Sequence, residues 1–598
     1  MGASSGSQYA NEMPSIPALT PLRAAAVELE LDDGVWLLGR TDLSYVEPAE
    51  VTVMEILRQA TDVSSMSAEL DLAGEGSAVT YHLSSQRANV VRFLDLPPHA
   101  RVLEIGSGCG AVTRYLGESC AVVDAVEPMA RRAKVARERC RDLPSVEVFA
   151  GEVEDVPLEP AYDVVLVNGV LEYVGNGAAG PADGIAFLAA IAARLLPGGT
   201  LIVAIENALG VKYVVGAPED HTDREFDSLE GYPRPNHARV RSRRGLLAML
   251  ASAGFDHTRV LGAFPDYKRT KVLIDDSIAD VDPSLAYRIP PFPSPDRRGY
   301  RHRIADEFSV WRTLVEAGLG SEFPNSFVAL AHRGEGTALW PDGRHAVFAR
   351  NLRKSQFAVT TVLETVAGQA RFRRESPTAG TLDGVRLSSV SQAFVAGTEM
   401  LDEIIAADDT RMTALMVAWS DAVEGADFTD GAPLDLLPHN MIVTPEGALV
   451  LIDDEYRATG WSRHDVRCRG VLTLALKLSA ATSASRWGQP TVGDLAQALG
   501  TMVGLSGDWL EGALVREAAL RRTVRPLSAV DTEAELRAAL ATPLVDGPLD
   551  LQAIRRLARA DAELVEVRER AEVSERALGE LRSGLAYRVI SWYRRRRG

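Results

Sequence analysis

The chain has 598 residues, of which 46% are hydrophobic and 24% charged, and its formal net charge is -18 at pH 7. This length exceeds what one hydrophobic core holds, so we expect several domains of roughly 150 residues each. The acidic balance argues against a nucleic-acid partner, because a net-negative surface repels phosphates.

The N-terminal part divides into a leader and a small cap. Residues 1–21 are rich in Ser, Ala, Gly and Pro, which predicts disorder, and they lack the regions of a secretory signal. Residues 22–85 alternate polar and apolar stretches, so we expect short strands and a helix near Val51–Ala60. The absence of a CxxC pair and of any run of about 18 apolar residues predicts a cytoplasmic protein with reduced thiols.

Residues 86–265 alternate between strand and helix patterns, which is typical of an α/β fold with a Rossmann-like parallel sheet covered by helices. The expected helices include Met129–Arg141 and Gly184–Leu195. The expected strands are Arg101–Ile105, Val122–Val126, Val146–Phe149, Val164–Asn168 and Thr200–Ile205.

The first of these strands ends at Glu104-Ile105 and leads into the turn Gly106-Ser107-Gly108-Cys109-Gly110. Alternating glycines let the backbone turn sharply and approach a bound nucleoside, where a Cβ atom would collide. Dinucleotide-binding folds use similar loops, so this turn alone predicts only a nucleoside site.

Polar residues at the ends of the next strands narrow the prediction. Glu127 closes the second strand, where a carboxylate can accept hydrogen bonds from both ribose hydroxyls. Glu152 and Val153 follow the third strand and can pair with an adenine through a carboxylate and a backbone amide. Asn168 ends the fourth strand, at the same edge of the expected sheet as these acids.

As a set, these motifs resemble those of class I S-adenosylmethionine-dependent methyltransferases, and the resemblance covers residues 86–265. It implies S-adenosylmethionine as the cofactor. By position, it implies that Glu104 and Gly106 to Gly110 line the methionine part, Glu127 the ribose, and Glu152 with Val153 the adenine.

The segment after the fifth strand opens toward the acceptor side of such a sheet. Methyl transfer is an in-line displacement that depends strongly on orientation, and a hydroxyl acceptor also benefits from a general base. His221 is the candidate base because imidazole accepts a proton near neutral pH, and Glu206 and Asp220 are further catalytic candidates. The alternative is a loop histidine that only caps or hydrogen-bonds locally.

Two further regions follow. Residues 266–310 are rich in Pro, Asp and Arg, which suits a linker or an irregular packed arm. Residues 311–545 place strands before helices, which predicts an α+β domain. Its expected early elements are a helix at Asp306–Ala317 and strands at Ser326–Ala331, His345–Ala349 and Leu387–Phe394.

Asp435 and Asn440 have the Asp-x-x-x-x-Asn spacing of kinase catalytic loops, and Asp453 follows a short hairpin. In such loops the first Asp positions the attacking hydroxyl, while the Asn and the second Asp hold a metal. The segment resembles choline- and aminoglycoside-kinase-like phosphotransferases. The resemblance implies ATP and Mg²⁺ as further ligands, with Asn440 and Asp453 on the metal.

Other residues depart from the kinase pattern. Pro433 stands where a His is expected, no glycine-rich phosphate loop is recognisable, and Arg350 or Lys354 stands in place of the ATP-binding Lys. Phosphate charge would therefore be poorly compensated. Three interpretations stay open: an active kinase, a reduced, non-catalytic kinase-like domain, and a coincidence in an unrelated fold.

Residues 546–598 carry a heptad pattern and a basic end. Apolar residues at seven-residue spacing predict a coiled coil and hence a homo-oligomer. The tail Trp592–Arg597 combines aromatic and cationic side chains, which suits peripheral contact with a membrane headgroup layer. The alternatives are a docking peptide for a partner such as a glycosyltransferase, and a solvated coiled-coil end.

The order of methyltransferase, kinase-like domain and coiled coil resembles bifunctional methyltransferase–kinase proteins that cap bacterial O-antigen polysaccharides. That resemblance implies an O-methyltransferase acting on a hydroxyl, or a sugar phosphate, of a surface glycan at the inner face of the membrane. Two alternatives stay open: a small-molecule methyltransferase of natural-product assembly, and a non-catalytic scaffold whose kinase-like domain binds a partner.

Overall fold

The computed structural model describes residues 20–25, 29–39, 48–73, 77–174, 181–234, 238–295, 303–349, 353–376, 380–388, 391–479, 487–525 and 532–544. The predicted leader, apart from its last residues, and the predicted coiled coil with its basic tail lie outside these residues. Among the described helices, none combines the length and apolar character that a bilayer crossing requires.

The N-terminal cap contains two short strands and a group of helices. The strands β1 (Glu30–Asp32) and β2 (Val35–Leu37) form a hairpin, and β2 pairs in parallel with β5 (Val146–Ala150). The expected helix near Val51–Ala60 is confirmed as α2 (Pro48–Gln59). The other helical segments are α1 (Pro21–Ala25), α3 (Ala68–Ala73), α4 (Ser77–Leu83), η1 (Ser85–Ala88) and α5 (Asn89–Arg92).

A parallel sheet with strand order β5-β4-β3-β6-β7 forms the centre of the N-terminal half, which confirms the predicted α/β fold and its five strands. Successive residues such as Val102 and Leu103 face opposite sides, because side chains alternate along a strand. They enter two separate hydrophobic clusters, one on each face of the sheet. The remaining strands are β3 (Arg101–Ile105), β4 (Val122–Glu127), β6 (Tyr162–Asn168) and β7 (Leu195–Glu206).

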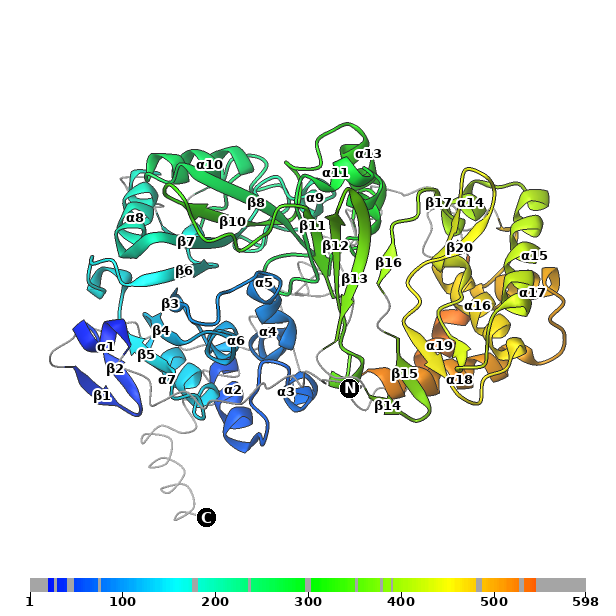
Figure 1. Ribbon diagram of the computed structural model, residues 1–598, viewed down its shortest axis with the longest axis horizontal. Helices are drawn as coiled ribbons and strands as arrows, with labels where there is room; N and C mark the ends of the chain where they lie inside the picture. The colour runs from blue at the N-terminus through cyan, green and yellow to red at the C-terminus, as the bar shows by residue number, and fades with distance from the viewer. Residues whose placement is uncertain are drawn as a thin grey trace, which may run out of the picture.

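Helices cover both faces of this sheet (Figure 1). Apolar residues of α6 (Ala111–Ser119) and α7 (Ala130–Arg139) enter the cluster of one face. Residues of α8 (Pro181–Arg194) and α10 (Arg243–Ser252) enter the cluster of the other. The carboxyl ends of the parallel strands therefore meet at one open edge, where ligands bind in such sheets.

One strand lies where the sequence predicts it but joins a different sheet from the one expected. β10 (Ser326–His332), expected within residues 311–545, pairs antiparallel with both β7 and β8 (His257–Phe264). Ala329 is fully buried in the same cluster as the parallel strands. The sheet built by residues 86–265 is thus completed by a strand that follows an excursion of the chain over residues 265–325.

The described residues of this excursion form a packed arm, one of the two forms expected for residues 266–310. Its apolar residues, including Tyr287 and Ile289, are buried against Trp311 and Phe348. Its elements are β9 (Val272–Ile274), α11 (Ile278–Val281) and α12 (Leu285–Arg288), followed by α13 (Glu307–Glu316). The short helix α9 (Val211–Val214) contributes Val211 to the same cluster.

Antiparallel strands extend the sheet from β9 toward the C-terminal half. The strand expected at Leu387–Phe394 is divided into β15 and β16, which belong to different sheets. The extending strands are β11 (Arg344–Phe348), β12 (Thr360–Val366), β13 (Gln369–Glu375) and β16 (Gln392–Ala393). Smaller sheets contain β14 (Thr381–Leu382), β15 (Val385–Leu387), β17 (Thr398–Glu399), β18 (Ala432–Pro433), β19 (Met441–Val443), β20 (Leu449–Leu451) and β21 (Tyr456–Ala458).

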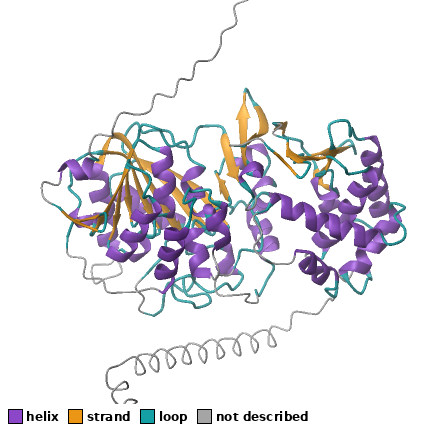
Figure 2. Cartoon of the chain, turned by 90° about the horizontal axis from the view of Figure 1, so that it is seen from below, coloured by secondary structure: helices purple, strands orange, loops and turns teal. Residues whose placement is uncertain are grey.

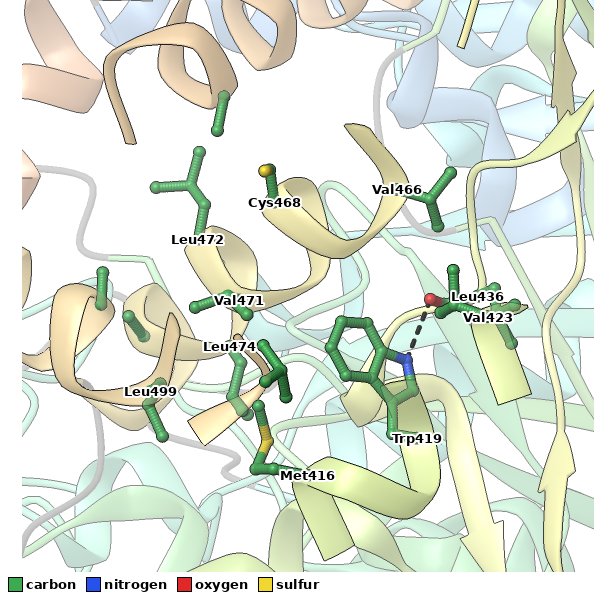
Figure 3. Close-up of a cluster of buried hydrophobic side chains, with 14 of the residues drawn as sticks. Met416, Trp419, Val423, Leu436, Val466, Cys468, Val471, Leu472, Leu474 and Leu499 are labelled. Atoms are coloured by element: carbon green, nitrogen blue, oxygen red, sulfur yellow. Dashed lines mark hydrogen bonds between the residues drawn. The ribbon is translucent and has the colours of Figure 1, made fainter. Parts of the chain in front are cut away.

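Helices dominate the last part of the described chain (Figure 2). Their core surrounds Trp419, whose indole nitrogen donates a hydrogen bond to the Leu436 carbonyl 3.2 Å away (Figure 3). A Cβ atom on Gly470 would lie 2.2 Å from the Trp419 ring, so the glycine permits this close packing. The helices are α14 (Met400–Ala406), α15 (Asp409–Gly425), α16 (Arg463–Leu478), α17 (Val492–Met502), α18 (Trp509–Val524) and α19 (Thr532–Leu540).

Candidate active site

A cavity of about 720 Å³ opens at the carboxyl ends of β3, β4, β5 and β6. The glycine turn after β3, the loop after β5 and the end of β6 form its walls, and α4 and η1 contribute residues from the cap. Eight of the nine predicted cofactor residues line it, namely Glu104, Gly106, Ser107, Gly108, Glu127, Glu152, Val153 and Asn168. The ninth, Gly110, belongs to the glycine turn but is not among the lining residues.

The glycine turn needs glycine at two positions for steric reasons. Gly106 and Gly110 have φ angles of 77° and 78°, which disfavour residues with a Cβ atom. A Cβ atom on Gly106 would lie 2.4 Å from Val170 Cγ2. On Gly110 it would lie 2.7 Å from the Ala136 Cα atom in α7. Gly110 is therefore required by packing between the turn and α7, whereas Gly108 has open space beside it.

Glu127 fixes the turn from the end of β4. Its carboxylate accepts hydrogen bonds from the backbone nitrogens of Gly108, at 2.8 Å, and Met129, at 3.2 Å. Burial raises the pKa of Glu127, while these hydrogen bonds act in the opposite direction. The side chain lines the cavity, so its position is compatible with the predicted contact to ribose hydroxyls.

Glu104 lies deeper, at the end of β3. It is fully buried, and Thr113 donates a hydrogen bond to its carboxylate at 2.6 Å. Burial without a cation in direct contact raises the pKa of Glu104 to about 7. A ligand that brings positive charge to this end of the cavity would be stabilised by ionisation of Glu104.

The residues of the cavity fit S-adenosylmethionine. Asn168 Oδ1 and Ser107 Oγ are buried in its wall without a hydrogen-bond partner in the protein, so both can bond to a polar ligand. Glu152 and Val153, the residues predicted to contact the adenine, also lie in the cavity wall. Glu152 is the N-cap of a 3₁₀ turn that begins at Val153, and a capping box with Asp155 stabilises this turn. Burial raises the pKa of Glu152, and the neighbouring acids Glu154 and Asp155 raise it further.

The three predicted catalytic residues come together at the other end of the cavity. His221 Nε2 lies 3.5 Å from the Glu206 carboxylate, and its Nδ1 lies 3.3 Å from the Tyr173 hydroxyl. Asp220 and His221 both line the cavity. The backbone nitrogen of His221 donates to Glu219 at 2.9 Å, which holds the loop. The imidazole of His221 thus contacts an acid at the end of β7 as well as a residue near the end of β6.

The charge state of His221 follows from these contacts. Burial alone would lower the pKa of the imidazole, but the hydrogen bond and charge of Glu206 outweigh it, so the pKa of His221 is raised. Burial likewise acts to raise the pKa of Glu206, but Lys268 and His221 outweigh it and lower that pKa. Glu206 is therefore the ionised partner of His221 at neutral pH.

Glu172, Glu206 and His221 offer donor atoms within 4.8 Å of one another. A metal ion does not fit among them, because the Lys268 ammonium forms an ion pair with Glu206 at this position. Burial raises the pKa of Glu172 to about 7, and the charge of Glu206 adds to this. The Tyr267 hydroxyl donates a hydrogen bond to Glu172 at 3.2 Å.

Several lining residues were not among the predicted site residues. Tyr81 and Arg87 come from the cap, Tyr173 follows β6, and Tyr267 with Lys268 follows β8. Tyr173 follows the strand end at Asn168 that the sequence had singled out. The others come from segments without a recognisable motif, and the fold alone brings them to the cavity.

The residues of the kinase-like motif, Asp435, Asn440 and Asp453, form a second cluster of polar residues. Their side chains form hydrogen bonds with other groups of the protein. Asp435 is buried, and its carboxylate accepts from the backbone nitrogens of Glu455 and Tyr456 at 3.0 and 2.8 Å. The Asn440 amide donates to the Asp435 carbonyl at 3.0 Å. Asp453 has a φ angle of 60° and accepts from Arg374 at 3.0 Å.

Mg²⁺ with ATP does not fit this cluster. The Arg374 guanidinium pairs with Asp453 at 3.0 Å, and Arg353 pairs with Glu455 at 2.7 Å, so both acids already have cationic partners. The ammonium of Lys354 donates to the Arg522 carbonyl at 2.9 Å and is thus used in a structural contact. Arg350 lies outside the described residues. The expected metal role of Asn440 and Asp453 is therefore not supported by these contacts.

Part of the chain matches the model of a known protein family. Residues 81–260 match the model of a methyltransferase domain. The chain is 36% identical over 85 residues to ribosomal RNA small subunit methyltransferase A of Geobacter metallireducens, covering 14% of this chain and 30% of that protein. It is 34% identical over 115 residues to protein-L-isoaspartate O-methyltransferase of Nitrobacter winogradskyi, covering 19% and 47%. The chain thus spans less than half the length of each.

Among solved structures, the chain is similar to a possible histamine N-methyltransferase from Thermotoga maritima, with 20% identity and a TM-score of 0.26. That likeness covers 42% of this chain and 91% of the other. The family match and the residues of the cavity agree with each other. The chain contains an S-adenosylmethionine-dependent methyltransferase domain.

Proposed function

We propose that the protein is an O-methyltransferase that transfers a methyl group from S-adenosylmethionine to a hydroxyl of a carbohydrate. One observation carries the proposal: His221, supported by Glu206, lies in the same cavity as Glu127 and the glycine turn. An acid-supported imidazole is the group that proton removal from a hydroxyl requires.

Different residues of the cavity would bind the cofactor and activate the acceptor. Glu127, Ser107 and Asn168 would hold the cofactor, which supplies an electrophilic methyl group when bound. Binding both reactants in line supplies much of the rate, because orientation replaces a bimolecular encounter. His221 would then accept the acceptor's hydroxyl proton at Nδ1, the nitrogen that faces Tyr173, while Glu206 stabilises the imidazolium that forms.

The paired charges favour a neutral acceptor group. Lys268 contacts Glu206 and Asp220, and Lys212 contacts Asp220 at 3.1 Å, so each ammonium is balanced by a carboxylate. A phosphate would therefore compete with two carboxylates for these ammonium groups. This supports a hydroxyl over a sugar phosphate, the second acceptor that the sequence suggested.

The aromatic side chains support a ring-shaped polar acceptor. Tyr81, Tyr173 and Tyr267 line the acceptor end, and each combines a flat apolar ring with a hydroxyl. The same proposal includes a surface glycan as the acceptor and a location at the inner membrane face. It also includes assembly through residues 546–598 and contact of the protein with a membrane or a glycosyltransferase. These parts of the proposal rest on sequence patterns.

The proposal is tested by incubating the full chain with methyl-labelled S-adenosylmethionine and two acceptor panels, oligosaccharides and small phenolic or alcoholic metabolites. We expect label on a carbohydrate hydroxyl, with loss of transfer in His221→Ala. Transfer only to small metabolites would favour the natural-product alternative. Cofactor binding without transfer to either panel would instead favour the scaffold alternative.

A further inference from the structure

Lys268 is held rigidly although it lies in a loop after β8. Its backbone nitrogen donates to Asp266 at 2.9 Å, and its carbonyl accepts a hydrogen bond from Arg87 at 2.7 Å. The side chain is 7% exposed. A lysine fixed at both the backbone and the ammonium is costly to order, since a free lysine side chain has many rotamers.

The Lys268 ammonium contacts two acids from different segments. It forms an ion pair with Glu206 at the end of β7, and it lies 2.7 Å from Asp220 Oδ2 in the next loop. Glu206 in turn faces His221 Nε2 at 3.5 Å. A chain of contacts therefore runs from Lys268 through Glu206 to the candidate base.

Charged and titratable groups from every neighbouring segment face this chain. Glu172 and Tyr173 come from the turn after β6, and Glu219 with Asp220 from the loop after α9. Among the described residues, the groups around His221 and Glu206 include Tyr81, Glu172, Tyr173, Lys212, Tyr213, Glu219, Asp220, Tyr232, Tyr267 and Lys268. Within this set, Lys268 is the cation in direct contact with Glu206.

We propose that Lys268 is a positioning residue for methyl transfer: its ammonium orients the Glu206 carboxylate against His221 Nε2 and places a positive charge beside the imidazole, so that His221 presents an unprotonated Nδ1 to the acceptor hydroxyl. The inference rests on the proposed function and deepens it. Lys268 acts here through two neighbours and touches no reacting atom.

Two effects of the ammonium lead to this assignment. It stabilises the Glu206 carboxylate against the burial that would otherwise favour protonation. Its positive charge also opposes protonation of His221, against the influence of Glu206 and Glu219. His221 must stay paired with the buried Glu206 carboxylate and must also be unprotonated in order to accept a proton. The first condition needs an ionised Glu206, and the second needs a cation that opposes protonation of His221.

The inference is tested in the full chain by NMR titration of histidine side chains, with S-adenosylhomocysteine present as the probe. The chain has 10 histidines, and His221→Gln identifies the signal of His221. In Lys268→Met, His221 still stabilises the Glu206 carboxylate, so the direct loss of a neighbouring cation dominates and we expect the His221 midpoint to rise by roughly one pH unit. Lys268→Arg should keep the midpoint of the wild type.

Kinetics give a second measurement. In Lys268→Met, kcat/KM at neutral pH should fall roughly tenfold and recover at higher pH, since the acid limb moves with His221. Lys271→Met is the matched control, because Lys271 lies in the same segment outside the cavity, and it should keep both the midpoint and the rate. A lysine needed only for folding would give a loss that higher pH does not restore.

An unchanged His221 midpoint in Lys268→Met would overturn the inference, whatever the rate. If Lys268→Met does not fold, Lys268→Gln removes the same charge with a shorter polar side chain and gives the same measurement. Failure of the proposed function looks different: the wild type would bind S-adenosylhomocysteine but methylate no hydroxyl, while the titration still reports on Lys268.

Discussion

The Glu127 carboxylate accepts a hydrogen bond from the Gly108 backbone nitrogen, 2.8 Å away, across 19 residues of sequence. This bond joins the end of β4 to the glycine turn after β3, so one acid both shapes the turn and lines the cavity beside it. The two strands are neighbours in the parallel sheet, which explains why the two motifs meet.

We expect Glu127→Ala to weaken S-adenosylmethionine binding by about ten- to a hundredfold, because hydrogen bonds to a charged group contribute about 1.5–3 kcal/mol each. Isothermal titration calorimetry with the cofactor measures this. Glu138→Ala is the control, since Glu138 lies on α7 in an exposed pair with Arg141. Equal affinity in the two variants would contradict the assignment of Glu127.

Two glycines of the turn should respond differently to alanine. In Gly110→Ala the Cβ atom would lie 2.7 Å from the Ala136 backbone, so we expect a loss of about 1–3 kcal/mol in unfolding free energy. Gly108→Ala meets open space and should be less destabilising, although its φ of 55° still causes strain. Denaturant melts of both variants test the ranking, and the reverse order would contradict it.

The central strands and the glycine turn could be predicted because their patterns are local. Alternating or continuous apolar runs predict the strands β3 to β7. Because these strands are parallel, the acids that follow them lie at the same edge of the sheet. His221 could be proposed because it follows Glu206 closely in sequence. Lys268 and Tyr267 could not, since only the pairing of β8 with β10 brings their loop to the cavity.

The place of β10 illustrates the same limit. Its apolar residues predicted a strand at Ser326–Ala331, but a strand pattern does not name its partners. The antiparallel insertion between β7 and β8 depends on the packed arm that precedes it, and no local signal encodes that contact. For the kinase-like motif, the spacing of Asp435 and Asn440 could be seen in the sequence. The pairing of Asp453 and Glu455 with arginines could not, because it depends on the fold.

Because β10 completes the methyltransferase sheet, Val328→Asp should abolish cofactor binding as well as lower the melting temperature. Val328 is fully buried between β7 and β8, and a buried unpaired charge destabilises by several kcal/mol. Val366→Asp, at a 44% exposed position of β12, is the control and should retain binding. Normal cofactor affinity in a folded Val328→Asp variant would show that β10 is not part of this unit.

Glu104 should make folding stability depend on pH. Its pKa in the folded state is about 7 against an ordinary value of 4.5, so between these values the folded protein binds more protons than the unfolded one. The unfolding free energy therefore falls as the pH rises through this window, by roughly 3 kcal/mol from this residue. Glu104→Gln should reduce the fall.

The measurement is a pair of denaturant melts at about pH 5 and about pH 7 for each protein, compared as differences. Other buried acids contribute the same slope to both proteins and cancel. Glu55→Gln on α2, outside the cavity, is the control and should keep the wild-type slope. An identical slope in Glu104→Gln and the wild type would contradict a raised pKa of Glu104.

The ion pair between Arg374 and Asp453 leads to a prediction on ATP binding and on the stability of the kinase-like region. Their ion pair is largely buried, with side-chain exposures of 4% and 18%, so Mg²⁺ and ATP should leave the melting temperature unchanged. Arg374→Met should cost about 3–5 kcal/mol, because it leaves buried carboxylates without their cation, and Arg374→Met with Asp453→Leu should recover part of this loss. Arg386→Met, in an exposed pair with Asp430, should change stability little. A rise in melting temperature with Mg²⁺ and ATP in the wild type would instead support an active kinase.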